Sequence, residues 1–204
     1  VTNWRFKMRK LLILMMISSN LLFANVNGIV DKIILHEGSG VEGNGLSKYG
    51  VTLETMKAYK LDVNGDSVIN KKDVYSMTKT KAKNFYKRLY AETFPHEKSS
   101  TVETILMPVV FDSAVNLGSF FAKNTLVKAT NSSIASHKLK GKKVNYVTEK
   151  NVFQYLNGLS VSELKEINNS FVNMRISKYV ALSKKPKFKK YKKGWIKRVK
   201  TYLL

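Results

Sequence analysis

The chain has 204 residues, with 36 Lys and Arg against 14 Asp and Glu, which gives a formal net charge of +22. Its 44% share of hydrophobic residues and mean hydropathy of -0.22 exclude a disordered polycation and a multi-span membrane protein, and the absence of Cys excludes disulfides and thiol chemistry. So large a positive excess predicts a polyanionic partner, such as nucleic acid, acidic lipid or cell-wall polymer.

The first residues have the pattern of an export signal. A basic stretch that ends at Lys10 precedes an apolar run from Leu11 to Phe23, and the small residue Ala24 follows. Such a run is too short to cross a bilayer comfortably. We therefore predict a cleaved signal peptide over residues 1–24 and an exported protein, periplasmic or secreted. Two alternatives stay open: a signal anchor that remains in the membrane, and a buried N-terminal helix.

A short helix and a small hairpin are predicted next. The helix is expected from near Asn27 to Gly38, because four residues recur at the spacing of one helical face: Val30, Ile33, Ile34 and Glu37. A glycine-rich stretch follows, with a β-hairpin around residues 48–52. Glycoside hydrolysis needs a carboxylic acid held at the mouth of a cleft, and Glu37 has a suitable place for this role. A surface glutamate at a helix end is also an ordinary structural feature.

The rest of the chain reads as mainly helical. A helix is expected over residues 80–92, and another begins near Pro108 and extends past Leu126. Three more are expected after Lys143. The long middle one starts at a capping box formed by Ser160 and Glu163, and the last covers residues 188–204.

Four segments together resemble glycoside hydrolase family 108, the peptidoglycan-degrading N-acetylmuramidases of phage lysins and bacterial secretion-associated proteins. These segments are Ile33–Gly38, Lys48–Thr52, Pro108–Gly118 and Gly194–Val199. The resemblance implies a mainly α fold, with a lysozyme-like α+β catalytic part that contains a small β-hairpin, followed by a small helical C-terminal module. It places the muramidase domain at residues 25–135 and a basic, peptidoglycan-binding helical module at residues 136–204.

The same resemblance implies a reaction. Glu37 matches the catalytic acid of the family, which cuts the bond between N-acetylmuramic acid and N-acetylglucosamine without a cofactor for catalysis. The second glycine after this acid is Ser39 here, and the Asp-x-Gly-Gly turn of the family is contracted to residues 42–45. If the reaction inverts, the candidates for the second catalytic group are Glu42 and a water molecule held by a hydroxyl group.

Five residues are candidates for substrate binding: His36, Tyr49, Thr52, Asp112 and Asn116. His36 either orients the acid or contacts sugar, unless it only packs at the surface, and Tyr49 either stacks on sugar or packs. Thr52 is a candidate, with Ser47, for positioning the attacking water. Asp112 and Asn116 are four residues apart on one helix, so they either line the cleft or brace the helix by hydrogen bonds.

Residues 62–73 have the pattern of a calcium loop. Oxygen-bearing side chains stand at positions 1, 3, 5, 9 and 12, and position 7 offers a backbone carbonyl; the six residues are Asp62, Asn64, Asp66, Val68, Asn70 and Asp73. The loop resembles that of a dockerin, although Ser67 replaces the usual glycine at position 6. A structural Ca²⁺ is predicted, with a plain Asx-rich turn as the alternative.

Most of the positive charge lies at the C-terminal end. Residues 138–204 contain 18 Lys and Arg and 3 acids, and three aromatic residues are interleaved with the last lysines: Phe188, Tyr191 and Trp195. We expect peptidoglycan and anionic cell-envelope polymers as partners and these aromatics as the buried face of the final helix. The export signal argues against nucleic acid, and we expect a monomer without a permanent membrane span. The alternative function is a catalytically inactive cell-wall-binding or lysis or secretion accessory protein of the same fold.

Overall fold

The computed structural model describes residues 26–43, 46–135 and 147–204. The described chain forms two compact units, Asn27–Pro95 and residues 96–204. The predicted signal peptide lies outside the described residues and stays a prediction. No helix in the described ranges is both long and apolar enough to cross a membrane.

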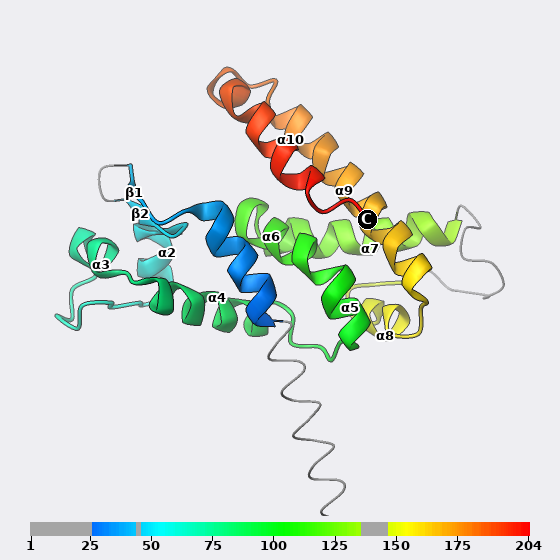
Figure 1. The fold of residues 1–204 in the computed structure, drawn as a ribbon, viewed down its shortest axis with the longest axis horizontal. Helices are drawn as coiled ribbons and strands as arrows, with labels where there is room; N and C mark the ends of the chain where they lie inside the picture. Colours follow the sequence, from blue (N-terminus) through cyan, green and yellow to red (C-terminus); the bar gives the residue numbers. More distant parts are fainter. Residues whose placement is uncertain (1–25, 44–45, 136–146) are drawn as a thin grey trace, which may run out of the picture. The chain divides into compact units, whose positions relative to one another are not determined.

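The unit Asn27–Pro95 combines short helices with a small sheet (Figure 1). A helix over residues 26–37 leads into three antiparallel strands in the order β1-β2-β3. The strands are β1 Val41–Glu42, β2 Ser47–Lys48 and β3 Val51–Thr52, and the following helices are α2 Leu53–Ala58, α3 Lys71–Ser76 and α4 Lys79–Thr93. The core is apolar and includes Val30, Ile33, Val51, Met56 and Phe85. The predicted first helix and hairpin are both confirmed.

The hairpin turn consists of Tyr49 and Gly50. Both have positive φ, 52° and 73°, and Lys48 pairs with Val51 on either side. Positive φ at both central residues is the geometry of the two-residue turn whose twist matches antiparallel strands. Glycine adopts it without penalty, so the sequence Tyr-Gly fixes the register of β2 and β3.

Helix α4 confirms the helix predicted over residues 80–92. Thr78 caps it by accepting a hydrogen bond from the backbone N–H of Lys81 at 3.2 Å. Its buried face includes Ala82, Phe85, Tyr86 and Tyr90. This face closes the core of the unit and brings Tyr86 beneath the hairpin turn.

The second unit is a helical bundle. Its elements are α5 Ser100–Ile105, α6 Met107–Leu117, α7 Ser119–Ala135, α8 Val152–Leu156, α9 Val161–Leu182, the 3-10 helix η1 Pro186–Tyr191 and α10 Lys192–Lys200. The single helix expected from Pro108 past Leu126 is wrong, because Gly118 adopts φ 90° and ends α6 before α7 begins. The final helix expected over residues 188–204 is likewise divided into η1 and α10.

Helix α9 organises the second unit. The capping box is confirmed: the backbone N–H of Ser160 donates to the Glu163 carboxylate at 2.7 Å, and the Ser160 side chain accepts from the N–H of Glu163. The helix packs along α7 and α10. The predicted domain boundary at residue 135 lies at the end of α7, inside this unit, whereas the packing divides the chain after Pro95. The whole is a mainly α fold with a small antiparallel sheet, as predicted.

Candidate functional site

Glu37 lies at the end of the first helix, against the hairpin turn. A Cβ atom added at Gly50 would stand 2.5 Å from the Glu37 Cγ and 2.7 Å from its Oε2, closer than real Cβ contacts. The carboxyl group therefore rests directly on the backbone of the turn. Only glycine fits there, because it supplies both the positive φ and the missing side chain. The turn thus holds the half-buried acid in a defined place.

Tyr86 is the second side chain at this contact. The same added Cβ would stand 2.7 Å from the Tyr86 hydroxyl oxygen, so the hydroxyl and the Glu37 carboxylate are neighbours over Gly50. The hydroxyl donates a hydrogen bond to the backbone carbonyl of Tyr49 at 2.9 Å. Tyr86 itself is buried. It therefore fixes the turn against α4 and, through the turn, fixes the acid.

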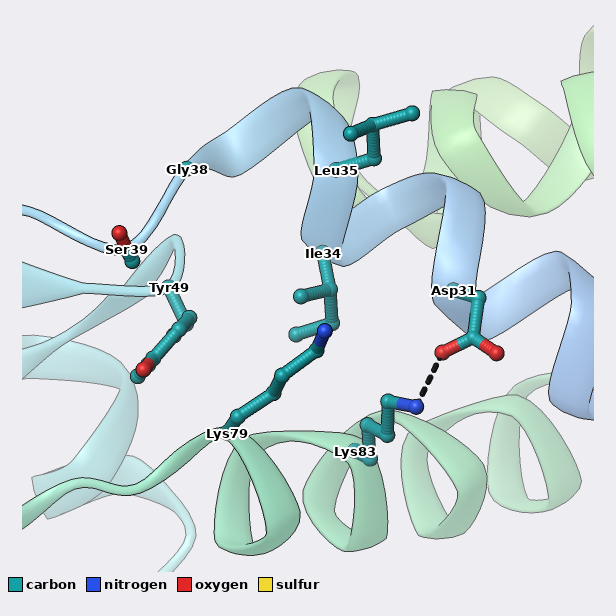
Figure 2. A pocket seen from close by; sticks show the side chains of 8 residues that line it. All are labelled: Asp31, Ile34, Leu35, Gly38, Ser39, Tyr49, Lys79 and Lys83. Atoms are coloured by element: carbon teal, nitrogen blue, oxygen red, sulfur yellow. Dashed lines mark ion pairs between the residues drawn. The ribbon is translucent and has the colours of Figure 1, made fainter.

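A pocket of about 460 Å³ lies between the first helix, the hairpin and the start of α4 (Figure 2). It is lined by Asp31, Ile34, Leu35, Gly38, Ser39, Tyr49, Lys79 and Lys83. Gly38 and Ser39 directly follow Glu37 in the chain, and Tyr49 directly precedes Gly50. Residues next to the acid and residues next to Gly50 therefore both line the pocket, although Glu37 itself does not.

The remaining predicted residues of this unit are less closely grouped. His36 is half-buried on the first helix, one residue before the acid, and does not line the pocket. Glu42 is exposed on β1. Thr52 caps α2, since its hydroxyl accepts a hydrogen bond from the backbone N–H of Thr55 at 3.0 Å. Of the predicted substrate-binding residues, Tyr49 is the one that lines the pocket.

Asp112 has a different setting in the helical unit. Its side chain is fully buried, and its two oxygens face two arginines: Arg175 of α9 at 2.6 Å and Arg198 of α10 at 2.5 Å. Burial raises the pKa of this carboxyl, but the charges and hydrogen bonds of Arg175 and Arg198 outweigh burial and hold the pKa below its ordinary value. Asp112 therefore joins α6, α9 and α10 as a buried brace whose ionised form is favoured by its two arginines.

This geometry favours the bracing interpretation for both helix residues. Asp112 has no exposed surface for sugar. The Asn116 amide donates to the backbone carbonyl of Asp112 at 2.8 Å, within the same helix. Arg198 belongs to the Gly-Trp-x-x-Arg segment near the C-terminus, so the role that the structure gives this arginine is to anchor α10 on α6.

The loop over residues 62–73 is folded by its own hydrogen bonds. Asp62 accepts from the backbone N–H of Gly65 at 2.7 Å and of Ser67 at 2.8 Å, while Asp66 accepts from that of Val68. Ser67 adopts φ 64°, the left-handed conformation that position 6 of a calcium loop requires. The chain thus follows the path of such a loop even without glycine at this position.

Asp73 closes the loop from the first turn of α3. Its two oxygens accept from the backbone N–H groups of Val63 at 2.7 Å and Asn70 at 2.8 Å. Burial raises its pKa, but these hydrogen bonds and one from Asn64 outweigh burial and lower the pKa. In the described ranges no three His, Cys, Asp or Glu side chains are grouped closely enough to hold a metal ion. The oxygen set of the motif remains chemically suited to Ca²⁺, and its binding stays a prediction.

The aromatic residues of the C-terminal segment gather around Trp195. Its ring stacks on Tyr179 of α9 at 5.0 Å and on Tyr191 at 5.5 Å, and Phe188 lies 5.8 Å away. Tyr179 is buried, whereas Tyr191 is 46% exposed. The cluster therefore joins η1 and α10 to α9 on one side and leaves an aromatic edge among lysines on the other.

Several residues of the site are absent from the sequence-based candidates. The sequence predicts Tyr86 only as part of the helix over residues 80–92, and Gly50 only as part of the hairpin. Lys79, Lys83 and Asp31 carried no motif at all. Their grouping depends on packing the first helix against α4, which no local pattern reveals.

One family model matches the chain. It is described as Glycosyl hydrolase 108 and covers residues 30–118, from the first helix to the glycine that ends α6. The matched range includes Glu37, the hairpin turn and every residue of the pocket. No curated protein and no solved structure matches the chain.

Proposed function

We propose that the chain is a glycoside hydrolase that cleaves peptidoglycan between N-acetylmuramic acid and N-acetylglucosamine, because residues 30–118 match the model of the glycosyl hydrolase 108 family. The observation that carries this proposal is the placement of Glu37. Its carboxyl group is pressed against Gly50, beside the Tyr86 hydroxyl and next to an open pocket. A single acid held in this way is suited to deliver a proton to a bound glycan.

Glu37 is the proposed general acid. Its protonated carboxyl donates to the glycosidic oxygen as the bond to the sugar breaks, and the sugar passes through an oxocarbenium-like transition state. The turn and Tyr86 act as positioning groups, because they restrict where the carboxyl can lie. A fixed proton donor avoids the entropy cost of finding the reactive geometry.

Glu42 remains the proposed second group. In an inverting enzyme it would activate water from the opposite face of the sugar, at a separation of about 6.5–9.5 Å between the two carboxyl groups. Its exposed position on β1 leaves it open to solvent and to substrate. Comparing the rates of Glu42→Gln and Glu37→Gln proteins would show which carboxylate the reaction depends on more.

The other parts of the chain have proposed supporting roles. Residues 136–204 are proposed to bind the wall polymer, and the segment over residues 1–24 to direct export. The first role is supported by the excess of lysines in η1 and α10, and the second by the apolar run before Ala24. Intact-mass analysis of secreted or periplasmic protein should give an N-terminus near residues 25–29.

The direct test of the proposed bond is product analysis. Purified peptidoglycan is incubated with the protein, its turbidity is followed, and the soluble fragments are identified by mass spectrometry after reduction. A muramidase yields reduced muramic acid at the new ends. Reduced N-acetylglucosamine would contradict the proposed bond, and binding without any loss of turbidity would favour the inactive wall-binding alternative.

A further inference from the structure

The pocket beside Glu37 contains an ammonium group without an assigned role. Lys79 is the first residue of α4, and in Figure 2 its side chain extends from the start of this helix toward Ile34. Within the described part of the chain, its amine has no hydrogen bond and no ion pair. This differs from Lys83, one turn further along, which forms an ion pair with Asp31 (Figure 2).

The charges of the pocket therefore do not balance. Two lysines and one aspartate line it. Lys83 forms an ion pair with Asp31, so none of the charged residues that line the pocket neutralises the charge of Lys79. An unmatched positive charge in a concave site attracts an anionic group, and an ammonium can bind a carboxylate through a charge-assisted hydrogen bond.

The rest of the lining describes the group that carries this anion. Ile34 and Leu35 contribute apolar side chains, and Leu35 is 80% exposed. Tyr49 offers an aromatic ring, while Ser39 offers a hydroxyl that can donate or accept. Such a lining suits a sugar with a short carbon branch that ends in a charge. It is less suited to a phosphate, for which several convergent donors are usual.

We propose that this pocket binds a carboxylate of the glycan strand, with Lys79 as its partner, and so distinguishes muramyl units from neutral N-acetylglucosamine. The inference rests on the proposed function, since the ligand of the pocket is taken to be the glycan strand to which Glu37 donates its proton. The carboxylate comes from one of two sources. It is either the lactyl ether of a peptide-free muramic acid or a carboxylate of the attached peptide stem.

Binding, separated from cleavage, tests the proposal. The Glu37→Gln protein, which lacks the transferable proton, is titrated calorimetrically at low salt with four tetrasaccharides: the N-acetylglucosamine tetramer, the peptide-free muramyl tetramer, its lactyl amide, and the stem-bearing form. We expect one carboxylate-bearing ligand to bind about fivefold more tightly than the lactyl amide, which is ~1 kcal/mol at 1.4 kcal/mol per tenfold. A preference for the peptide-free acid identifies the lactyl source, and a preference confined to the stem-bearing form identifies the stem.

A matched pair of variants assigns the effect to Lys79. Lys79→Met on the same background should abolish the preference, whereas Lys57→Met should retain it, because Lys57 is exposed on α2 of the same unit but does not line the pocket. Equal melting temperatures of the two variants show that both are folded.

Each result bears on one of the two proposals. Equal affinity for charged and neutral ligands, or a preference that survives Lys79→Met, overturns the assignment of the pocket even if the wild-type protein cleaves peptidoglycan. A Lys79-dependent preference in a protein whose wild type cleaves no glycan supports the pocket and contradicts the proposed hydrolase activity.

Discussion

Replacing Gly50 by alanine should disable the site while leaving most of the fold intact. The new Cβ would stand 2.5 Å from the Glu37 Cγ and 2.7 Å from the Tyr86 hydroxyl oxygen, so at least one of these groups must move. A left-handed backbone conformation costs an alanine about 1–2 kcal/mol. We expect the free energy of unfolding to fall by ~1–3 kcal/mol once the displacement is included.

The loss of activity should be much larger than this loss of stability. A displacement of about 1 Å in a catalytic group can reduce the rate by roughly 100-fold, even in a folded protein. We therefore expect kcat for peptidoglycan cleavage to fall by about 100-fold. The assay is the initial rate of turbidity loss at saturating substrate, with urea unfolding measured on the same preparation.

Gly65 provides the matched control. It has φ 80° in the same unit, yet a Cβ added there meets nothing within 4 Å. Gly65→Ala should therefore show the backbone penalty alone, ~1 kcal/mol, with an unchanged rate. If both alanine variants lost activity equally, or if Gly50→Ala kept the wild-type rate, the contact between the turn and the acid would have no catalytic importance.

Three further predictions concern residues other than the acid and its turn. Asp112→Asn should lower the free energy of unfolding by ~3–5 kcal/mol, because it leaves Arg175 buried without its counter-charge. In the wild type, the lowered pKa of Asp112 gives a contribution to stability that is complete above about pH 4 and is lost as the pH falls through the folded-state pKa. Urea unfolding from pH 5 to pH 2 measures both the effect of the substitution and this pH dependence. A wild-type protein whose stability does not fall in acid would refute the bracing role of Asp112. Excess Ca²⁺ should raise the melting temperature relative to a chelator if residues 62–73 bind the ion in the native state, and identical midpoints would refute the site. Charge reversal at five lysines of η1 and α10 should weaken sedimentation with cell walls at low salt but spare cleavage of short soluble glycans. The five are Lys187, Lys189, Lys190, Lys192 and Lys193. A simultaneous loss of both activities would contradict the separate roles of the two parts.

The local elements of this fold could be predicted from the sequence because their signals are local. The spacing of Ile33, Ile34 and Glu37 gives the first helix, and Ser160 with Glu163 marks the start of α9. The one helix predicted from Pro108 past Leu126 is wrong for a reason that is also local. Gly118 lay inside an apolar pattern that continued on both sides, so the pattern suggested one helix where the positive φ of this glycine makes two.

The site was predictable only in part, because its geometry depends on contacts between distant residues. Glu37 could be identified from its place in a motif. The Tyr86 hydroxyl reaches the carbonyl of Tyr49 from 37 positions away, and Asp112 meets Arg198 across 86 positions. Neither partner can be chosen from periodicity, since many tyrosines and basic residues have equivalent local surroundings. The sequence around Asp112 therefore allows two interpretations, and the positions of Arg175 and Arg198 decide between them.

The central claim, that Glu37 is the proton donor, is tested most directly by the rate of the Glu37→Gln protein on purified peptidoglycan. The amide keeps the size of the side chain and its fit over Gly50, but it has no acidic proton to transfer. With circular dichroism and melting temperature matched to the wild type, we expect kcat to fall by about 100-fold to 10,000-fold. A folded Gln variant that cleaves at the wild-type rate would contradict the assignment of Glu37.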